Sequence, residues 1–143
     1  MKIAIDAMGG DFAPLETVLG SIEAVRANEH IEVVLVGDEQ QIFNILEARN
    51  EAKNPRISVH HASQVIGMDE HPGQALRKKK DASIVVATSL VRDNACDAVI
   101  APGSTGAAVA AALFGLGRIK GVDRPVIACL LYTSPSPRDS TSS

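Results

Sequence analysis

The segment KIAIDAMGGDFAPLETVLGSIEAV (residues 2–25) contains the patterns of a strand, a glycine-rich loop and a helix in succession. Its first five residues are mostly apolar, which predicts a short buried strand over residues 2–6. Pro14 is expected to open the helix, because proline is favoured in the first helical turn. The apolar residues of that helix follow at helical spacing: Leu15, Val18, Leu19, Ile22 and Val25.

The same alternation continues along the chain. We predict further strands over residues 31–36, 56–60, 97–100 and 126–131. Helices are predicted over residues 38–46, 74–80, 83–93 and 105–116, the first of them capped by Asp38. Strands that alternate with helices form right-handed crossovers and a mostly parallel sheet. The predicted fold class is therefore α/β.

The composition limits the classes of protein to be considered. The chain has 143 residues, enough for one domain or a piece of a larger one. Hydrophobic residues make up 45% of it and aromatic residues 3%, so we expect an aliphatic core. The net charge of -3 argues against nucleic acid as the main partner. Cys96 and Cys129 are too few for a disulfide framework, and we expect a reduced, cytoplasmic protein with both thiols in its core. The longest apolar run, residues 106–117, is too short to span a bilayer and is expected to form a buried helix.

Unusual residues gather in the loops that follow the predicted strands, in residues 6–13, 37–38, 61–73 and 101–105. In a parallel sheet these loops leave the same edge, and ligands bind there. The loop of Gly103, Ser104, Thr105 and Gly106 precedes a helix, so its N–H groups and hydroxyls predict a phosphate cradle. The alternative is an ordinary turn in which Ser104 or Thr105 caps the helix. Because no lysine follows the second glycine, this loop is not a P-loop.

The first loop carries two glycines between two acids. Gly9 and Gly10 also suggest a phosphate cradle, but Asp6 and Asp11 would repel a dianion at close range. We therefore assign the anion to residues 103–106, and expect Gly9 and Gly10 to let the backbone approach the substrate closely. Asp6 or Asp11 is expected to orient a cation or a donor, and Asp11 alternatively to satisfy N–H groups ahead of Pro14.

His71 completes the set of candidate catalytic residues with Asp6 and Asp11. It lies beside two acids in a loop at the ligand-binding edge, which makes it a candidate general acid–base. His60 and His61 are adjacent on a predicted strand and point to opposite faces, so we expect no metal site there.

The run RKKK (residues 77–80) is the densest cluster of charge. A solvated helix face is the plainer interpretation. The sharper one is a docking patch for an acidic partner, or a source of cations for the anion site, with Arg77, Lys78 and Lys80 as candidates. Arg118, in a later loop, is either a solvated surface cation or a further contact to the anion.

The last dozen residues, YTSPSPRDSTSS from Tyr132 on, differ in composition from the rest. Serine, threonine and proline dominate them, and they lack apolar periodicity. The stretch LLYTSPSPRDS also resembles translated adapter sequence from DNA library preparation. We predict that residues 131–143 are a non-native, disordered read-through and that residues 1–130 are native.

Four motifs occur in order: IDAMGGDFAP (residues 5–14), IGMDEHPGQALRKKKDASI (66–84), APGSTGA (101–107) and LGRIKGVDRP (116–125). Together they resemble the bacterial phosphate acyltransferases of the PlsX family. The resemblance implies a three-layer, Rossmann-like fold related to the isocitrate and isopropylmalate dehydrogenases. It implies transfer of a fatty acyl group from acyl carrier protein to inorganic phosphate, for phospholipid synthesis. It also implies a cytoplasmic homodimer at the membrane surface, without a metal or an organic cofactor.

The resemblance carries two qualifications. Family members are more than twice as long as this chain, which implies an N-terminal fragment that is inactive by itself. Their glycine loop usually reads Ser-Ala-Gly-Asn-Thr-Gly, and Ser104 here replaces the asparagine and its amide donor. Phosphate is itself a nucleophile, so the chemistry requires an anion cradle, oxyanion donors and a way to stabilise the thiolate, but no catalytic triad. The alternative is an α/β module that binds a nucleotide or another phosphate ligand without acyl transfer.

Overall fold

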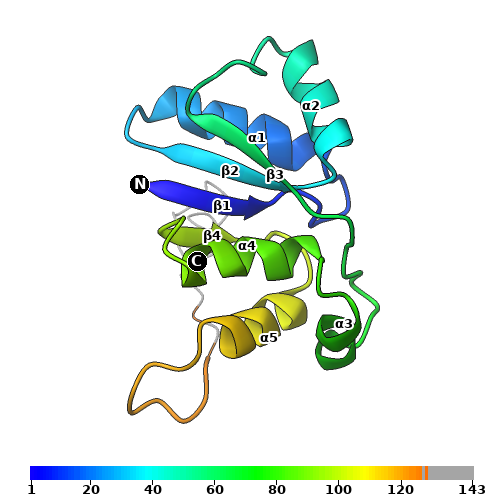
Figure 1. Cartoon of the computed structure of the whole chain (residues 1–143), viewed down its shortest axis with the longest axis vertical. Coiled ribbons are helices and arrows are strands. Elements are labelled where there is room, and N and C mark those ends of the chain that lie inside the picture. Colours follow the sequence, from blue (N-terminus) through cyan, green and yellow to red (C-terminus); the bar gives the residue numbers. More distant parts are fainter. Residues whose placement is uncertain (127, 129–143) are drawn as a thin grey trace, which may run out of the picture.

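The computed structural model describes residues 1–126 and 128, and shows a parallel α/β arrangement (Figure 1). In chain order the elements are β1 (Lys2–Asp6), α1 (Leu15–Ala27), β2 (Glu32–Gly37), α2 (Glu39–Ala48), β3 (Ile57–His61), α3 (Pro72–Lys78), α4 (Ser83–Arg92), β4 (Ala98–Ile100) and α5 (Thr105–Gly115). The four strands form one sheet in the order β3-β2-β1-β4, and every neighbouring pair is parallel. The predicted α/β class with a mostly parallel sheet is confirmed.

The helices cover both faces of this sheet, which gives three layers. Helices α1 and α2 pack on one face, and α4 packs on the other (Figure 1). Helices α3 and α5 pack against each other, and α5 also packs against α4. The arrangement is that of a Rossmann-like three-layer fold.

Strand β2 shows why an aliphatic sequence forms this sheet. Val33 and Leu35 join the cluster beneath α1 and α2, whereas Val34 and Val36 join the cluster beneath α4. All four side chains are buried, because successive residues of a strand point to opposite faces and both faces are covered. Burying a side chain of this size contributes about 1.5–3 kcal/mol.

A third cluster, built mainly from small side chains, joins α3, α4 and α5. Its buried members are Ile66, Ala75, Ala82, Ile84, Ala107 and Ala111. Alanine lets the helices approach closely, and so does Gly115, where a Cβ atom would lie 3.0 Å from Thr88 Cγ2. The expectation of a buried helix here is only partly correct. Within the described chain, α5 buries Ala107 and Ala111 but leaves Phe114 73% exposed, because it packs on α3 and α4 rather than on the sheet.

The element boundaries agree with the local sequence signals at α2 and α3, but α1 begins without a capping side chain in the described chain. Asp38 caps α2 as predicted, and its Oδ1 accepts a hydrogen bond from Gln41 N at 3.0 Å. Helix α3 begins at Pro72, two residues before the predicted start, because His71 caps it and proline suits the first turn. Pro14 is the N-cap residue of α1 and no side chain caps that helix, so Asp11 does not satisfy its N–H groups.

Two predictions concern the end of the chain. The predicted strand over residues 126–131 lies outside the described residues except for Val126 and Ala128, and Val126 is not in a strand. The predicted non-native tail, residues 131–143, lies entirely outside them, as does Cys129. Cys96 is buried in the core as expected, and burial raises the pKa of its thiol.

A buried carboxylate holds the turn between α2 and β3. Glu51 is 8% exposed and accepts hydrogen bonds from Arg26 Nε and Asn54 Nδ2, each at 2.9 Å. These two partners, Asn54 first, hold the pKa of Glu51 below its usual value. We expect Glu51→Gln to lower the free energy of unfolding by about 1–2 kcal/mol at pH 7.

The sign of the pH dependence follows from the lowered pKa. The stabilisation from Glu51 is fully present above the ordinary glutamate pKa, and is lost as the pH falls through the lower value in the folded protein. Urea unfolding at pH 7 and at pH 3 should therefore show a difference between wild type and Glu51→Gln that shrinks in acid. Glu47→Gln is the control, because Glu47 is exposed on α2. An equal effect of the two substitutions would contradict the prediction.

Candidate active-site crevice

The sheet order places a crevice between the carboxyl ends of β1 and β4. The chain runs from β1 to β2 and β3 on one side, and returns to β4 on the other side of β1. The connections to β2 and to β4 therefore lie on opposite sides of β1, and ligands bind at such switch points of a parallel sheet. A cavity of about 160 Å³ lies here. It is lined by both loops, by residues 65–68 after β3, and by the first turns of α4 and α5.

The two glycine loops contact each other directly in this crevice. A Cβ atom on Gly9 would lie 2.7 Å from Gly103 N, and one on Gly103 would lie 3.0 Å from Gly9 Cα. The distance at Gly9 is shorter than real Cβ atoms show, so the loops can pack this closely only because Gly9 lacks a Cβ atom, and the distance at Gly103 leaves little room for one. Gly10 adopts a φ of +100°, which also favours glycine. The sequence predicted that Gly9 and Gly10 let the backbone approach a substrate closely. The structure shows in addition that Gly9 lets the loop after β1 approach the loop after β4.

Asp6 is the last residue of β1 and lines the cavity. It is 6% exposed, and its Oδ1 accepts a hydrogen bond from Met8 N at 3.1 Å. Burial raises the pKa of Asp6, because desolvation disfavours the carboxylate more than the hydrogen bonds favour it. The buried Ser83 hydroxyl lies beside this carboxyl, but makes no hydrogen bond of ordinary geometry within the described chain. A carboxyl group that is neutral for more of the pH range repels an anion less, and can hold or pass on a proton.

The N-terminus of α5 forms the other side of the crevice. Ser104 is its N-cap residue, and Ser104 Oγ accepts a hydrogen bond from Ala107 N at 3.2 Å. The capping interpretation of Ser104 is therefore confirmed. Its hydroxyl proton is still available to a ligand, as are N–H groups of the first turn, which have no acceptor within the helix. These donors and the helix dipole suit an anion.

Only part of the predicted phosphate loop lines the crevice. Gly103 and Ser104 do, together with Gly9 and Gly10. Thr105 and Gly106 belong to the first turn of α5 and do not line the cavity. Gly106 instead faces the start of α3, because a Cβ atom there would lie 2.9 Å from Pro72 Cγ.

The other two candidate catalytic residues lie away from the cavity. His71 Nδ1 accepts a hydrogen bond from Gln74 N, at 3.4 Å, as the cap of α3. His71 lines a separate hollow beside Glu70 and Lys78. Asp11 is exposed in the first loop and is not part of the cavity lining. Of the three candidate catalytic residues, the structure thus places Asp6, but neither His71 nor Asp11, in the lining of the crevice.

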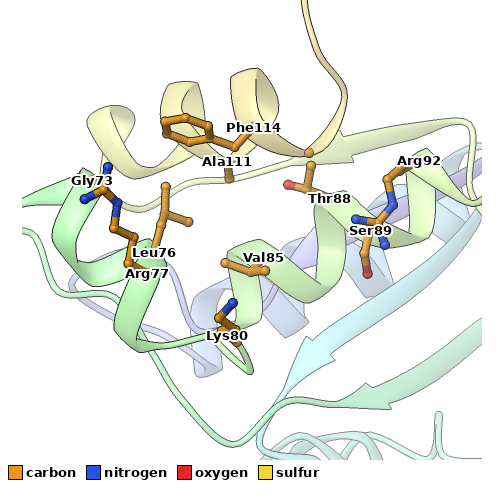
Figure 2. Close-up of a pocket in the computed structure, with 11 residues that line it drawn as sticks. Gly73, Leu76, Arg77, Lys80, Val85, Thr88, Ser89, Arg92, Ala111 and Phe114 are labelled. Carbon is orange, nitrogen blue, oxygen red and sulfur yellow. The ribbon is translucent and has the colours of Figure 1, made fainter.

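The four predicted cations also lie outside the crevice, whose described lining contains no lysine or arginine. Arg77 and Lys80 line a second cavity of about 280 Å³ between α3, α4 and α5 (Figure 2). Lys78 lines the hollow beside His71, and Arg118 donates a hydrogen bond to the Asp123 carbonyl at 2.6 Å.

The basic run is divided because α3 ends within it: Arg77 and Lys78 are helical and point about 100° apart, whereas Lys79 and Lys80 follow the helix. Its remaining member, Lys79, pairs with Glu70 Oε2 at 2.8 Å. Arg92, from the end of α4, joins Arg77 and Lys80 at the second cavity. Sequence reasoning did not single out Arg92, which is the one charged residue of α4.

Parallel strands and a crevice at the switch point, beside the N-terminus of α5, define an α/β protein with a candidate ligand site at the carboxyl edge of its sheet. Comparison with known proteins identifies the family. The family model described as "Fatty acid synthesis protein" matches residues 1–139, and the chain belongs to this family.

Similar curated proteins carry the name phosphate acyltransferase. The protein of Heliobacterium modesticaldum is 53% identical over 133 residues, which are 93% of this chain and 39% of that protein. The protein of Pelotomaculum thermopropionicum is 54% identical over 131 residues, 92% of this chain and 37% of that protein. The chain thus spans about two fifths of the length of these relatives. The resemblance seen in the sequence motifs is confirmed.

No helix in the described part of the chain is both long enough and apolar enough to cross a membrane.

Proposed function

We propose that the chain forms part of an enzyme that transfers a fatty acyl group from acyl carrier protein to inorganic phosphate. The observation that supports this most is the crevice itself, which is lined by a buried acid, by two glycine loops in contact and by the N-cap residue of α5. Membership of a family whose curated members are named phosphate acyltransferase supports the same reaction. The product is an acyl phosphate, which serves phospholipid synthesis.

The proposed reaction assigns a task to each side of the crevice. A phosphate oxygen attacks the thioester carbonyl, the new C–O bond forms and the C–S bond breaks. The proton of the phosphate ends on the departing thiolate of the carrier. Ser104, the N-cap residue of α5, holds the phosphate, and Asp6, with its raised pKa, takes and returns the proton. The N–H groups of Gly10 and Gly103 donate no hydrogen bond to the described chain, and they are the donors that we assign to the oxyanion.

The proposal extends to the carrier and to the assembly. Arg77, Lys78 and Lys80 are exposed on and next to α3, where they can attract the acidic surface of a carrier protein. Arg118 is exposed beyond α5 and can contribute to the same attraction. By the family resemblance we also propose that the longer protein is a cytoplasmic homodimer that associates with the membrane surface. His71 stays a predicted acid–base residue without a place in the crevice.

The sharpest test alters one charge at the helix cap. Ser104→Asn and Ser104→Asp both preserve a good N-cap, so both variants should fold with similar stability. The aspartate alone places a negative charge at the proposed phosphate site. Two like charges about 4 Å apart repel by about 4 kcal/mol near a protein surface, so we expect the apparent KM for phosphate to rise at least about tenfold relative to Ser104→Asn.

The assay requires the rest of the enzyme. We would use a chimera of residues 1–125 with the carboxyl-terminal part of the Heliobacterium modesticaldum protein, and measure acyl phosphate formed from acyl carrier thioester. The 143-residue chain by itself is expected to show no turnover. Equal KM values in the two Ser104 variants would remove the phosphate from the α5 N-terminus. Saturable binding of ATP or NAD to a chimera without acyl transfer would instead support the nucleotide-binding alternative.

A further inference from the structure

The cavity between α3, α4 and α5 is a second concave site that the proposed reaction does not use. Its volume is about 280 Å³, larger than that of the crevice. Leu76, Val85 and Phe114 supply an apolar lining from three different helices (Figure 2). Phe114 lines the cavity and yet is 73% exposed. An aromatic side chain in that position leaves apolar surface for a ligand to cover.

The rim of the same cavity is cationic. Arg77 and Lys80 lie on the α3 side and Arg92 lies near the far end of α4 (Figure 2). Arg92 pairs with Asp93 at 3.1 Å, which reduces its attraction for another anion. Arg77 and Lys80 have no ion-pair partner in the described part of the chain, and no lining residue is acidic. The strongest attraction for an anion is therefore at the α3 side.

We propose that this cavity binds a monoacyl anion, a molecule with one phosphate or carboxylate head and one hydrocarbon chain. The head contacts Arg77 and Lys80, and the chain lies along Leu76, Val85 and Phe114. The three apolar side chains come from three helices around one cavity, and a single hydrocarbon chain can lie along them. The proposal concerns binding alone and does not depend on acyl transfer at the crevice.

Lys78 provides a matched control on the same helix. It has the same charge as its neighbour Arg77 and is also exposed, but it lines a different hollow with Glu70 and His71. A ligand in the α3/α4/α5 cavity should therefore depend on Arg77 and Lys80 and be insensitive to Lys78. General attraction of an anion to a basic helix would depend on all three residues.

The absence of tryptophan from the chain permits a selective reporter. In Phe114→Trp, the single indole lines the cavity, and a bound hydrocarbon chain should shift its emission to shorter wavelength. The probe is decyl phosphate, kept below the concentration at which it forms micelles. We expect saturable binding, at least about tenfold weaker when Arg77→Gln and Lys80→Gln are combined, and within about twofold of the reporter protein in Lys78→Gln. Calorimetry on the wild-type chain checks that the reporter does not create the site.

Several outcomes would overturn the proposal. Decanol that binds as tightly as decyl phosphate would show that the cations do not contribute to binding. Inorganic phosphate that binds as tightly as decyl phosphate would show that the hydrocarbon chain of the ligand does not contribute. Equal weakening by Lys78→Gln would indicate non-specific attraction. Binding to phosphatidylglycerol vesicles without binding of dispersed decyl phosphate would assign the surface to a membrane. All altered side chains are exposed, and circular dichroism shows whether each variant keeps its fold.

Discussion

Gly9→Ala is expected to abolish acyl transfer in the chimera and to lower the free energy of unfolding by about 1–3 kcal/mol. The new Cβ atom would lie 2.7 Å from Gly103 N and 3.1 Å from Gly103 Cα. Both are backbone atoms, so the clash is relieved only if one loop moves. That movement separates the two sides of the crevice, and a displacement of this kind misplaces the reacting groups.

Two further variants show whether the effect comes from the contact. Gly103→Ala should act in the same direction, and the double substitution should cost less than the sum of the single ones because both force the same separation of the two loops. Gly20→Ala is the control: nothing lies within 4 Å of a Cβ atom there, and the site is exposed on α1. Alanine should stabilise that helix by about 0.5–1 kcal/mol. Urea unfolding and steady-state kinetics measure both quantities, and wild-type turnover in Gly9→Ala would show that the contact is not needed for the site.

Asp6→Asn is expected to lower turnover about 10²–10⁴-fold while raising stability at neutral pH. Burial raises the pKa of Asp6, so the folded protein binds a proton more tightly than the unfolded chain does. Stability is then lost as the pH rises from the ordinary aspartate pKa through the raised one. Asparagine carries no charge and escapes this loss, and its side-chain oxygen can still accept the hydrogen bond from Met8 N.

Unfolding measured across the pH range tests the sign. The two proteins should be similarly stable in acid, below the ordinary aspartate pKa, and Asp6→Asn should become the more stable one as the pH rises. Asp11→Asn is the matched substitution in the same loop. Because Asp11 is exposed, its replacement should leave this stability profile unchanged. A wild-type protein that gains stability relative to Asp6→Asn as the pH rises would show that Asp6 is stabilised as a carboxylate.

The sequence by itself determined most of the secondary structure. The strand over residues 2–6 was predicted with the bounds that β1 has, and the cap at Asp38 was identified from its spacing to Gln41. Such features depend on neighbours within a few residues, so the local pattern is sufficient. His71 and Pro72 are an equally local signal for the start of α3, because His71 caps the helix and Pro72 suits its first turn. The sequence prediction instead treated His71 as a candidate general acid–base and began the helix two residues later.

Only the tertiary structure decided which residues meet. The contact of Gly9 with Gly103 depends on β4 lying beside β1, and strand order is not encoded in the pattern of any single strand. The division of the basic run depends on the end of α3 at Lys78 and on the packing of that helix against α5. The sequence indicated that Asp6 would repel an anion, but burial raises its pKa and weakens that objection. Charge state and contact are properties of the folded environment, because solvent exclusion comes from segments far away in the chain.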